Sequence, residues 1–283
     1  MRTGLRQTRS LGGNIFVYGM LILFGMFFAW PLIFTINNAF KPLNEIFLMP
    51  PRLWVQQPTT DNFQDLFVMM GASRITFSRY IFNTAFPTAA GTFGHIIIAS
   101  MGAYVISKYK FPGSRLFFKL VIVTLMFSGY VTQIPNFLIM NQLGWIDTYA
   151  AIIVPAFAMP IGFFLLKQFM DTVPMTLIEA AKIDGAKELS IFWRIVMPTV
   201  KPAWLTVMVF SVNNLWNTRA SNFIFTEDLK PLPYALSQIA AGGVQRAGVS
   251  AAVTLFIMIV PIAIFIGAQS NIIETMASSG IKE

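Results

Sequence analysis

Residues 179–203 have the sequence EAAKIDGAKELSIFWRIVMPTVKPA, a polar, helix-forming segment between long apolar stretches. Pro174 suits the first turn of a helix and Gly185 suits its end, so the pattern predicts one helix over 174–184 and a second over 187–197. Each helix carries an apolar stripe at three-and-four spacing. The stripes are Leu177, Ile178 and Ala181 in the first helix, and Leu189, Phe192, Ile195 and Val196 in the second. We therefore predict two short helices that meet at a fixed corner and need a packing partner.

The composition predicts an all-α integral membrane protein. Of the 283 residues, 55% are hydrophobic and only 11% are charged, which is far too apolar for a soluble domain. The chain has no cysteine, and this excludes disulfides, thiol catalysis and thiolate metal sites. His95 is the only histidine and cannot form a histidine cluster, so we predict no metal site.

Hydropathy predicts six transmembrane helices in a single transmembrane domain, residues 1–283. A span of 22 residues extends about 33 Å as a helix, enough to cross the hydrocarbon core. The predicted spans are 15–36, 80–106, 116–140, 149–166, 203–225 and 251–270, with a loop at 171–201 between the fourth and fifth and a C-terminal tail at 271–283.

Lysine and arginine are distributed unequally between the two sides of these spans. Thirteen lie on the side of both termini and the 171–201 loop, and six lie on the other side. Positively charged residues collect on the cytoplasmic side of membrane proteins. We therefore predict that both termini and the loop are cytoplasmic. This asymmetry accounts for most of the net charge of +8, so the charge requires no nucleic-acid partner.

The loop also carries a motif. Its Glu-Ala-Ala run, the glycine six residues after the glutamate, and the Ile-x-x-Pro ending at Pro198 resemble the EAA loop of ATP-binding-cassette (ABC) importer permeases. Met197 departs from the usual leucine, a volume-conserving change. The resemblance implies that the loop docks into a separate cytoplasmic ATPase. The alternative is a helix pair that only packs on its own membrane domain, which would explain the apolar stripes but not the motif. The residues implied in coupling are Glu179, Ala180, Ala181, Asp184, Gly185, Ala186, Phe192 and Pro198.

The resemblance extends over nearly the whole chain. Residues 37–67 are similar to the corresponding stretch of carbohydrate permeases of the maltose-importer G type, and the tail is similar as well. It implies an oligosaccharide substrate, with an acidic one such as alginate as a candidate, and a location in the bacterial inner membrane. The implied partners are a second permease subunit, two ATPase subunits and an extracytoplasmic solute-binding protein. The implied contacts are Ala240, Ala241, Gly242 and Gly243 with the binding protein, and Ser278, Ser279 and Gly280 with the ATPase.

The chain itself carries no recognisable energy source or active site. It contains no G-x-x-x-x-G-K-[ST] phosphate loop, so ATP and magnesium are expected on the partner ATPase and no cofactor on this chain. No carboxylate pair, nucleophile with a base, or metal-spaced cluster emerges, so we predict a translocase subunit and not an enzyme.

Span five contains the unusual polar run NNLWNTR. Polar side chains at membrane depth are costly unless they face a cavity or another helix. Asparagine amides could bind sugar hydroxyls, an indole face could stack on a sugar ring, and Arg219 could pair with a sugar carboxylate. Alternatively the groups bind neighbouring helices, and Arg219 reaches the outer interface or an acid of the partner subunit. The candidate path residues are Asn213, Asn214, Trp216, Asn217 and Arg219.

Two further features leave alternatives open. His95 is expected to make an interhelical hydrogen bond, because no carboxylate within the spans could serve it as a proton-relay partner. Prolines interrupt several spans and could be fixed kinks or hinges.

A stand-alone secondary transporter or channel remains the alternative function, although such proteins usually show ionisable residues in their spans or an inverted repeat.

Overall fold

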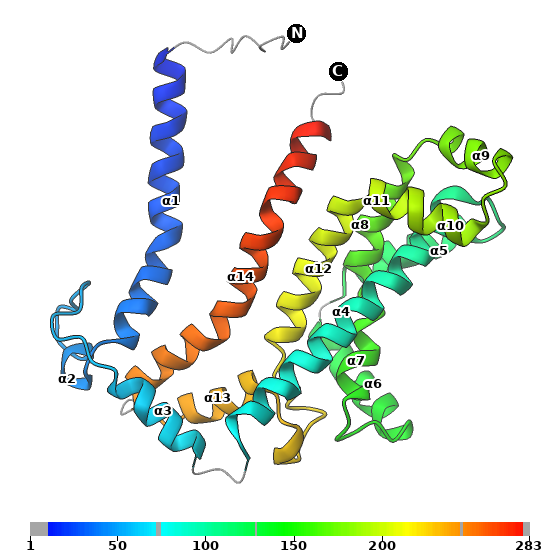
Figure 1. Ribbon diagram of the computed structural model, residues 1–283. Coiled ribbons are helices and arrows are strands. Elements are labelled where there is room, and N and C mark those ends of the chain that lie inside the picture. Colours follow the sequence, from blue (N-terminus) through cyan, green and yellow to red (C-terminus); the bar gives the residue numbers. More distant parts are fainter. Residues whose placement is uncertain (1–10, 72–74, 128, 244–245, 280–283) are drawn as a thin grey trace. The chain divides into compact units, whose positions relative to one another are not determined.

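The computed structural model describes residues 11–71, 75–127, 129–243 and 246–279, and every regular element among them is a helix (Figure 1). This confirms the predicted all-α class. The chain divides into two compact units, the first made of Met1–Met69 and Ile239–Leu255 and the second of Met70–Gln238 and Phe256–Glu283.

Four helical stretches among the described residues are long and apolar enough to cross a membrane. The helix pair Glu188–Thr199 and Lys201–Trp216 meets the same test only when its two helices are taken together, and they are bent by 80° relative to each other. The four stretches are Gly12–Ala39, Phe77–Lys108, Ala150–Asp171 and Ala247–Gln269.

The first unit begins with α1 (Leu11–Ala39), whose side chains are almost all exposed within the described chain. A helix that is apolar on every side suits a lipid environment. After α1 come α2 (Leu43–Ile46) and α3 (Asp61–Gly71), joined by an irregular segment held together by buried polar groups. The Asn62 amide donates to the carbonyls of Ala39 and Lys41 at 2.9 and 2.8 Å.

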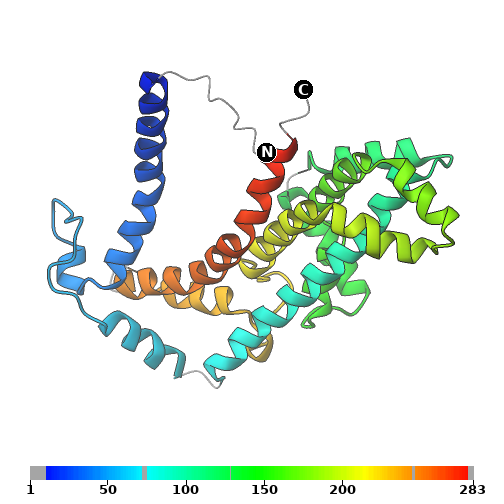
Figure 2. The same ribbon diagram turned by 45° about the horizontal axis from the view of Figure 1, so that its top comes forward.

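The second unit is built around α4 (Phe77–Lys108), α8 (Pro160–Asp171) and α12 (Lys201–Trp216). Both views show α4, in cyan, beside α8 in green and α12 in yellow (Figure 1, Figure 2). Glycines permit this close approach, as is common between membrane helices. A Cβ on Gly94 would lie 2.1 Å from the Phe157 ring, and one on Gly162 would lie 2.0 Å from His95 Nε2.

Two of the expected spans are divided. The stretch 116–140 contains α5 (Ser114–Thr124) and α6 (Gly129–Gln142), separated by tight turns at 125–127. The stretch 149–166 contains α7 (Ala150–Ala156) and α8, which starts at Pro160. Proline has no backbone N–H to continue a helical hydrogen-bond ladder, and glycine is a poor helix former. These properties of Pro160 and Gly129 account for the breaks.

The fifth span is shorter than expected, because α12 ends at Trp216 and not near residue 225. The Asn217 side chain donates to the Asn213 carbonyl at 2.8 Å and so helps to end the helix. The following residues form a loop bound to Asp147, whose carboxylate accepts the N–H groups of Phe225 and Thr226 at 2.6 and 2.9 Å. The loop leads through η2 (Glu227–Leu229) into α13 (Leu232–Ala240), and α14 (Ala247–Ser279) follows.

Candidate functional site

The segment between α8 and α12 folds as a bent helical corner, which we call the elbow (residues 175–199). It contains α9 (Met175–Ile183), α10 (Glu188–Ile191), the π-helical turn η1 (Phe192–Val196) and α11 (Met197–Thr199). The two predicted helices are therefore present, with the second interrupted by a π turn. That turn directly precedes Pro198, whose ring would clash with the Arg194 carbonyl in a regular α-helix. π turns of this kind are frequent at functional sites.

Gly185 forms the corner, as the sequence predicted. Its φ of +79° is left-handed, a conformation that glycine adopts without steric cost. The Ala186 N–H donates to the Ala181 carbonyl at 2.9 Å, and the Gly185 N–H donates to the Lys182 carbonyl at 3.0 Å. This pair of hydrogen bonds is a Schellman motif, which ends α9 and sets the direction of α10.

One face of the elbow packs on its own chain. Ile178, Ile191 and Val196 are fully buried in a core shared with α4, α8 and α12. Of the residues predicted to couple to an ATPase, Ala181 and Phe192 are buried in this core and Ala186 is half-buried. The exposed members are Glu179, Ala180, Asp184, Gly185 and Pro198.

Four large apolar side chains of the elbow are exposed. Leu177 is 46% exposed, Ile183 86%, Leu189 64% and Trp193 47%. Each predicted stripe is thus divided, since Ile178 is buried on one side while Leu177 projects outward on the other. A set of large exposed apolar side chains on one element marks an interaction surface.

A polar cluster ties the elbow to the end of α4. Lys182 Nζ lies 2.6 Å from Glu188 Oε1, which joins α9 to α10 across the corner. Tyr104 Oη donates to Glu188 Oε2 at 3.1 Å, and Lys182 donates to the Tyr109 hydroxyl at 3.2 Å. Hydrogen bonding to Glu188 raises the pKa of Lys182, and the bond to Tyr109 adds to the effect. The cluster holds the corner in one shape against α4.

The residues predicted to line a path differ in how far they are buried. Asn213, Asn214, Asn217 and Arg219 are exposed. Arg219 lies beyond the end of α12, so the prediction that it sits within a span is wrong. Its guanidinium has no hydrogen bond or ion pair to any part of the chain that the structure describes.

Trp216 differs from the prediction of an indole open to a sugar. Only 6% of it is exposed, and its Nε1–H donates to the Ile257 carbonyl of α14 at 2.9 Å. Pro261 stands four residues after Ile257 and has no N–H, so it leaves this carbonyl without its helical donor. Trp216 supplies the missing hydrogen bond and joins α12 to α14 at the proline.

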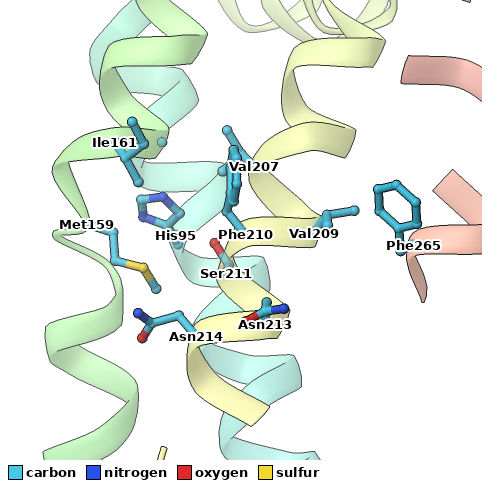
Figure 3. A pocket seen from close by; sticks show the side chains of 11 residues that line it. His95, Met159, Ile161, Val207, Val209, Phe210, Ser211, Asn213, Asn214 and Phe265 are labelled. Carbon is cyan, nitrogen blue, oxygen red and sulfur yellow. The ribbon is translucent and has the colours of Figure 1, made fainter. Parts of the chain in front are cut away.

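A cavity of about 510 Å³ lies within the second unit, between α4, α8, α12 and α14. Figure 3 shows His95 between α8 and α12, with Ser211 and the two asparagines nearby. The cavity thus includes Asn213 and Asn214 from the predicted path, but not Asn217 or Arg219. Its lining residues are His95, Met159, Ile161, Gly162, Val207, Val209, Phe210, Ser211, Asn213, Asn214 and Phe265.

His95 was expected to hydrogen-bond to another helix; its Nδ1 instead lies 3.2 Å from the carbonyl of Phe157, in a neighbouring turn. Phe157 falls in the break between α7 and α8, so its carbonyl lies outside both helices. His95 is 1% exposed, and its Nε2 has no partner within the described residues. No site was predicted at His95, because an isolated histidine in a span does not indicate where another part of the chain leaves its helix.

The end of the second unit opposite the elbow is also tied together. Tyr80 donates to the Glu227 carboxylate at 2.6 Å, and Tyr149 donates to the Asn83 amide oxygen at 2.6 Å. The Thr226 N–H is the main reason that the pKa of Asp147 is held below its usual value, with partial burial opposing it and the Phe225 N–H adding to it. This loop is therefore anchored before α13 begins.

The remaining predicted contact residues lie near α13 and at the chain end. Ala240 ends α13, and Ala241, Gly242 and Gly243 follow in an exposed turn. Ser278 and Ser279 belong to the last turn of α14, but their side chains, like Gly280, lie outside the described residues.

Several helices long and apolar enough to span a membrane, exposed apolar side chains on the elbow and a cavity lined by α4, α8, α12 and α14 are typical of the membrane domain of a transporter. The chain belongs to the family described as binding-protein-dependent transport system inner membrane component, whose sequence profile matches residues 107–277. It is therefore a multi-pass inner membrane permease subunit of an ABC importer, and the predicted transport role, rather than an enzymatic one, is confirmed.

Two relatives illustrate the family. The polygalacturonan/rhamnogalacturonan transport system permease protein YtcP of Bacillus subtilis (strain 168) is 30% identical over 80% of this chain and 77% of its own length. The arabinooligosaccharides transport system permease protein AraQ of Halalkalibacterium halodurans is 27% identical over 90% of this chain and 91% of its own.

Solved structures share the fold. A chain of the bacterial ABC transporter that imports the acidic polysaccharide alginate matches with a TM-score of 0.75 at 24% identity, over 93% of this chain and 98% of that one. A chain of the bacterial alginate transporter bound to a periplasmic protein that carries alginate pentasaccharide matches with a TM-score of 0.62 at 15% identity, covering 93% and 96%.

Proposed function

We propose that the exposed apolar face of the elbow is the docking surface for a cytoplasmic ATPase. The observation that carries this proposal is that Leu177, Ile183, Leu189 and Trp193 are exposed on a corner whose other face is fixed to the bundle. Force applied to that face passes through Ile178 and Phe192 into α4, α8 and α12. ATP and magnesium belong to the ATPase, and this chain converts its closure and opening into alternating access.

The topology that we propose has six spans, with α5 and α6 together making the third and α7 with α8 the fourth. The excess of lysine and arginine beside the elbow supports a cytoplasmic elbow and cytoplasmic termini. The partners are a second permease subunit, two ATPase subunits and an extracytoplasmic solute-binding protein. The turn 240–243 faces the binding protein, and residues 278–280 reach the ATPase.

The substrate that we propose is an oligosaccharide, with an acidic one such as alginate as the particular candidate. Sugar polymers or oligosaccharides are named for YtcP and AraQ, and the acidic polysaccharide alginate for the structural neighbour. Arg219 lies exposed after α12, without an ion pair to the described residues, and could bind a carboxylate.

The docking proposal is tested by purifying the assembled complex from variants of the elbow. Leu189→Ser should reduce the ATPase retained with the chain and its substrate-stimulated hydrolysis, because it removes exposed apolar surface without disturbing the core. Leu143→Ser is the matched control, since Leu143 is similarly exposed, at 51% against 64%, but lies after α6. Equal ATPase retention in wild type and Leu189→Ser would contradict docking at this face. Transport without any co-purifying ATPase would support a stand-alone transporter.

A further inference from the structure

We infer that residues 47–54, which we call the finger, insert into the outer leaflet of the lipid bilayer next to α1 and anchor the first unit there. The finger has the sequence FLMPPRLW, with five large apolar side chains, two prolines, one arginine and no acidic residue. The inference goes beyond the transport role, but it rests on the proposed topology, which puts the segment between α1 and α4 on the outer side of the membrane.

The apolar side chains of the finger are exposed. Met49 is 90% exposed and Trp54 is 65% exposed. The exposed apolar members are Phe47, Leu48, Met49, Leu53 and Trp54. A contiguous set of large exposed apolar side chains marks a contact with either a protein or a membrane.

The finger is held in one shape by a stem of buried polar groups. The Glu45 carboxylate, 6% exposed, accepts the N–H groups of Gln56 and Gln57 at 2.9 and 3.3 Å. Lys41 Nζ is buried as well and donates to the Arg52 carbonyl at 2.6 Å. The buried charges of Glu45 and Lys41 therefore fix the base of the finger, and its apolar side chains project from that base.

The direction of the finger relates it to the membrane. The 29 residues of α1 extend about 43 Å, whereas the hydrocarbon core is roughly 30 Å thick. Only residues 40–42 separate α1 from α2, so the finger starts close to the end of α1. Both views show the segment between α2 and α3, in light blue, turning back alongside the C-terminal part of α1 (Figure 1, Figure 2). The finger therefore lies at the level where the outer lipid layer surrounds α1.

The composition of the finger suits lipid better than a protein partner. Pro50 and Pro51 have no N–H, so its apex carries fewer backbone groups that need water. Trp54 has the amphipathic indole that concentrates at the membrane–water interface. Arg52 is exposed, donates to the Gln56 side chain and forms no ion pair with a described residue, so its other N–H groups can bind a lipid phosphate. A protein interface would surround its apolar centre with polar side chains, and the finger offers only Arg52.

The test measures contact between the finger and lipid acyl chains. The chain has no native cysteine, so Met49→Cys labelled with the fluorophore NBD gives a single reporter when the other subunits are also cysteine-free. The whole transporter, with its partner permease and ATPases, is placed in nanodiscs with or without a phospholipid that carries a nitroxide quencher near the headgroup end of its acyl chain. Asp65→Cys, exposed on α3 of the same unit, is the matched control.

The nitroxide lipid should quench the Met49→Cys reporter at least about twofold more than the Asp65→Cys control, because membrane-surface elements bury their apolar side about 5–10 Å into the boundary between headgroups and acyl chains. Trp54→Ser should reduce this difference, since it removes the largest side chain of the finger. Val68→Ser, an apolar position on α3 that is 71% exposed, should leave it unchanged. Unchanged quenching in Trp54→Ser would contradict the anchoring role of the finger.

Three other results would overturn the inference. The first is quenching of Met49→Cys no greater than that of Asp65→Cys. The second is quenching that disappears when the binding protein is added, since the finger would then contact that protein. The third is a reporter shielded from both the nitroxide lipid and aqueous iodide, which would place the finger against the second permease.

Failure of the proposed function or topology gives a different result. An impermeant maleimide that does not label Asp65→Cys from outside spheroplasts would contradict the proposed topology, and with it insertion into the outer leaflet. A complex that quenches as expected but does not transport would count against the importer role alone.

Discussion

Replacing Gly185 with valine is the sharpest test of the elbow. A Cβ built on Gly185 meets nothing within 4 Å, so the substitution creates no clash with neighbouring atoms. The cost arises only from the backbone, because a φ of +79° is unfavourable for a residue with a side chain. That cost is about 1–2 kcal/mol, equivalent to a change of roughly 5- to 30-fold in an equilibrium constant.

The cost falls on the corner and not on the bundle. Ile178 and Ile191, which anchor the elbow on either side of Gly185, stay buried in the core. The protein should therefore insert and remain folded, while α10 and the exposed Leu189 are misdirected. We expect substrate-stimulated ATP hydrolysis in the reconstituted complex to fall by about the same 5- to 30-fold factor, since docking needs both helices in position.

Gly185→Asn is the matched control. Asparagine tolerates the left-handed conformation far better than valine does, so this variant should retain most of the coupled hydrolysis. Binding-protein affinity for the sugar should stay unchanged in both, because capture occurs on another protein. Wild-type rates of stimulated hydrolysis and transport in Gly185→Val would refute the reasoning that the left-handed corner sets the docking geometry.

Three other predictions follow from individual contacts. Trp216→Phe should destabilise the protein by about 1 kcal/mol, because it leaves the Ile257 carbonyl unpaired. The same substitution should cost clearly less in a Pro261→Ala background, which supplies a backbone N–H to that carbonyl. Additive thermal shifts in this double-mutant cycle would contradict the prediction. Arg219→Gln should lower transport of an acidic oligosaccharide and spare a neutral one, and equal losses for both would remove Arg219 as a carboxylate contact. Asp147→Asn should speed amide exchange at 223–226 at neutral pH. Because the folded pKa of Asp147 is depressed, the difference from wild type should shrink as pH falls below 3.8, the usual value, and a difference independent of pH would point to another cause.

The elbow could be predicted well from the sequence because its signals are local. Gly185 ends α9 with a positive φ, as a glycine after a helical pattern should. The apolar stripes also predicted which segments would be amphipathic. Periodicity could not tell that Ile178 would face the bundle while Leu177 would face outward, because that choice depends on where α4 and α8 lie.

The membrane cavity could be predicted only in part, because its contacts join residues that are distant in the sequence. Asn213 and Asn214 were expected to line a path and do line a cavity. Trp216 was expected beside them, but its indole is buried and donates to the Ile257 carbonyl. That carbonyl lacks a helical donor because of Pro261, which stands 45 residues after Trp216 in the sequence. Hydropathy also placed Arg219 inside a span. A hydropathy profile does not detect that α12 ends at Trp216, because the side-chain hydrogen bond from Asn217 that helps to end the helix leaves no trace in hydrophobicity.

The hydrogen bond from Trp216 to Ile257 has a consequence for biosynthesis. A carbonyl without a donor is costly in the hydrocarbon layer, so α14 with Pro261 is a poor segment to release into lipid alone. The ribosome makes Trp216 before Ile257, and the indole therefore already lies in the membrane when α14 leaves the insertion machinery. Because α12 is made first, its Trp216 indole can donate to the Ile257 carbonyl as α14 enters the membrane. A circularly permuted chain that begins with α14 would have to insert α14 before Trp216 is present.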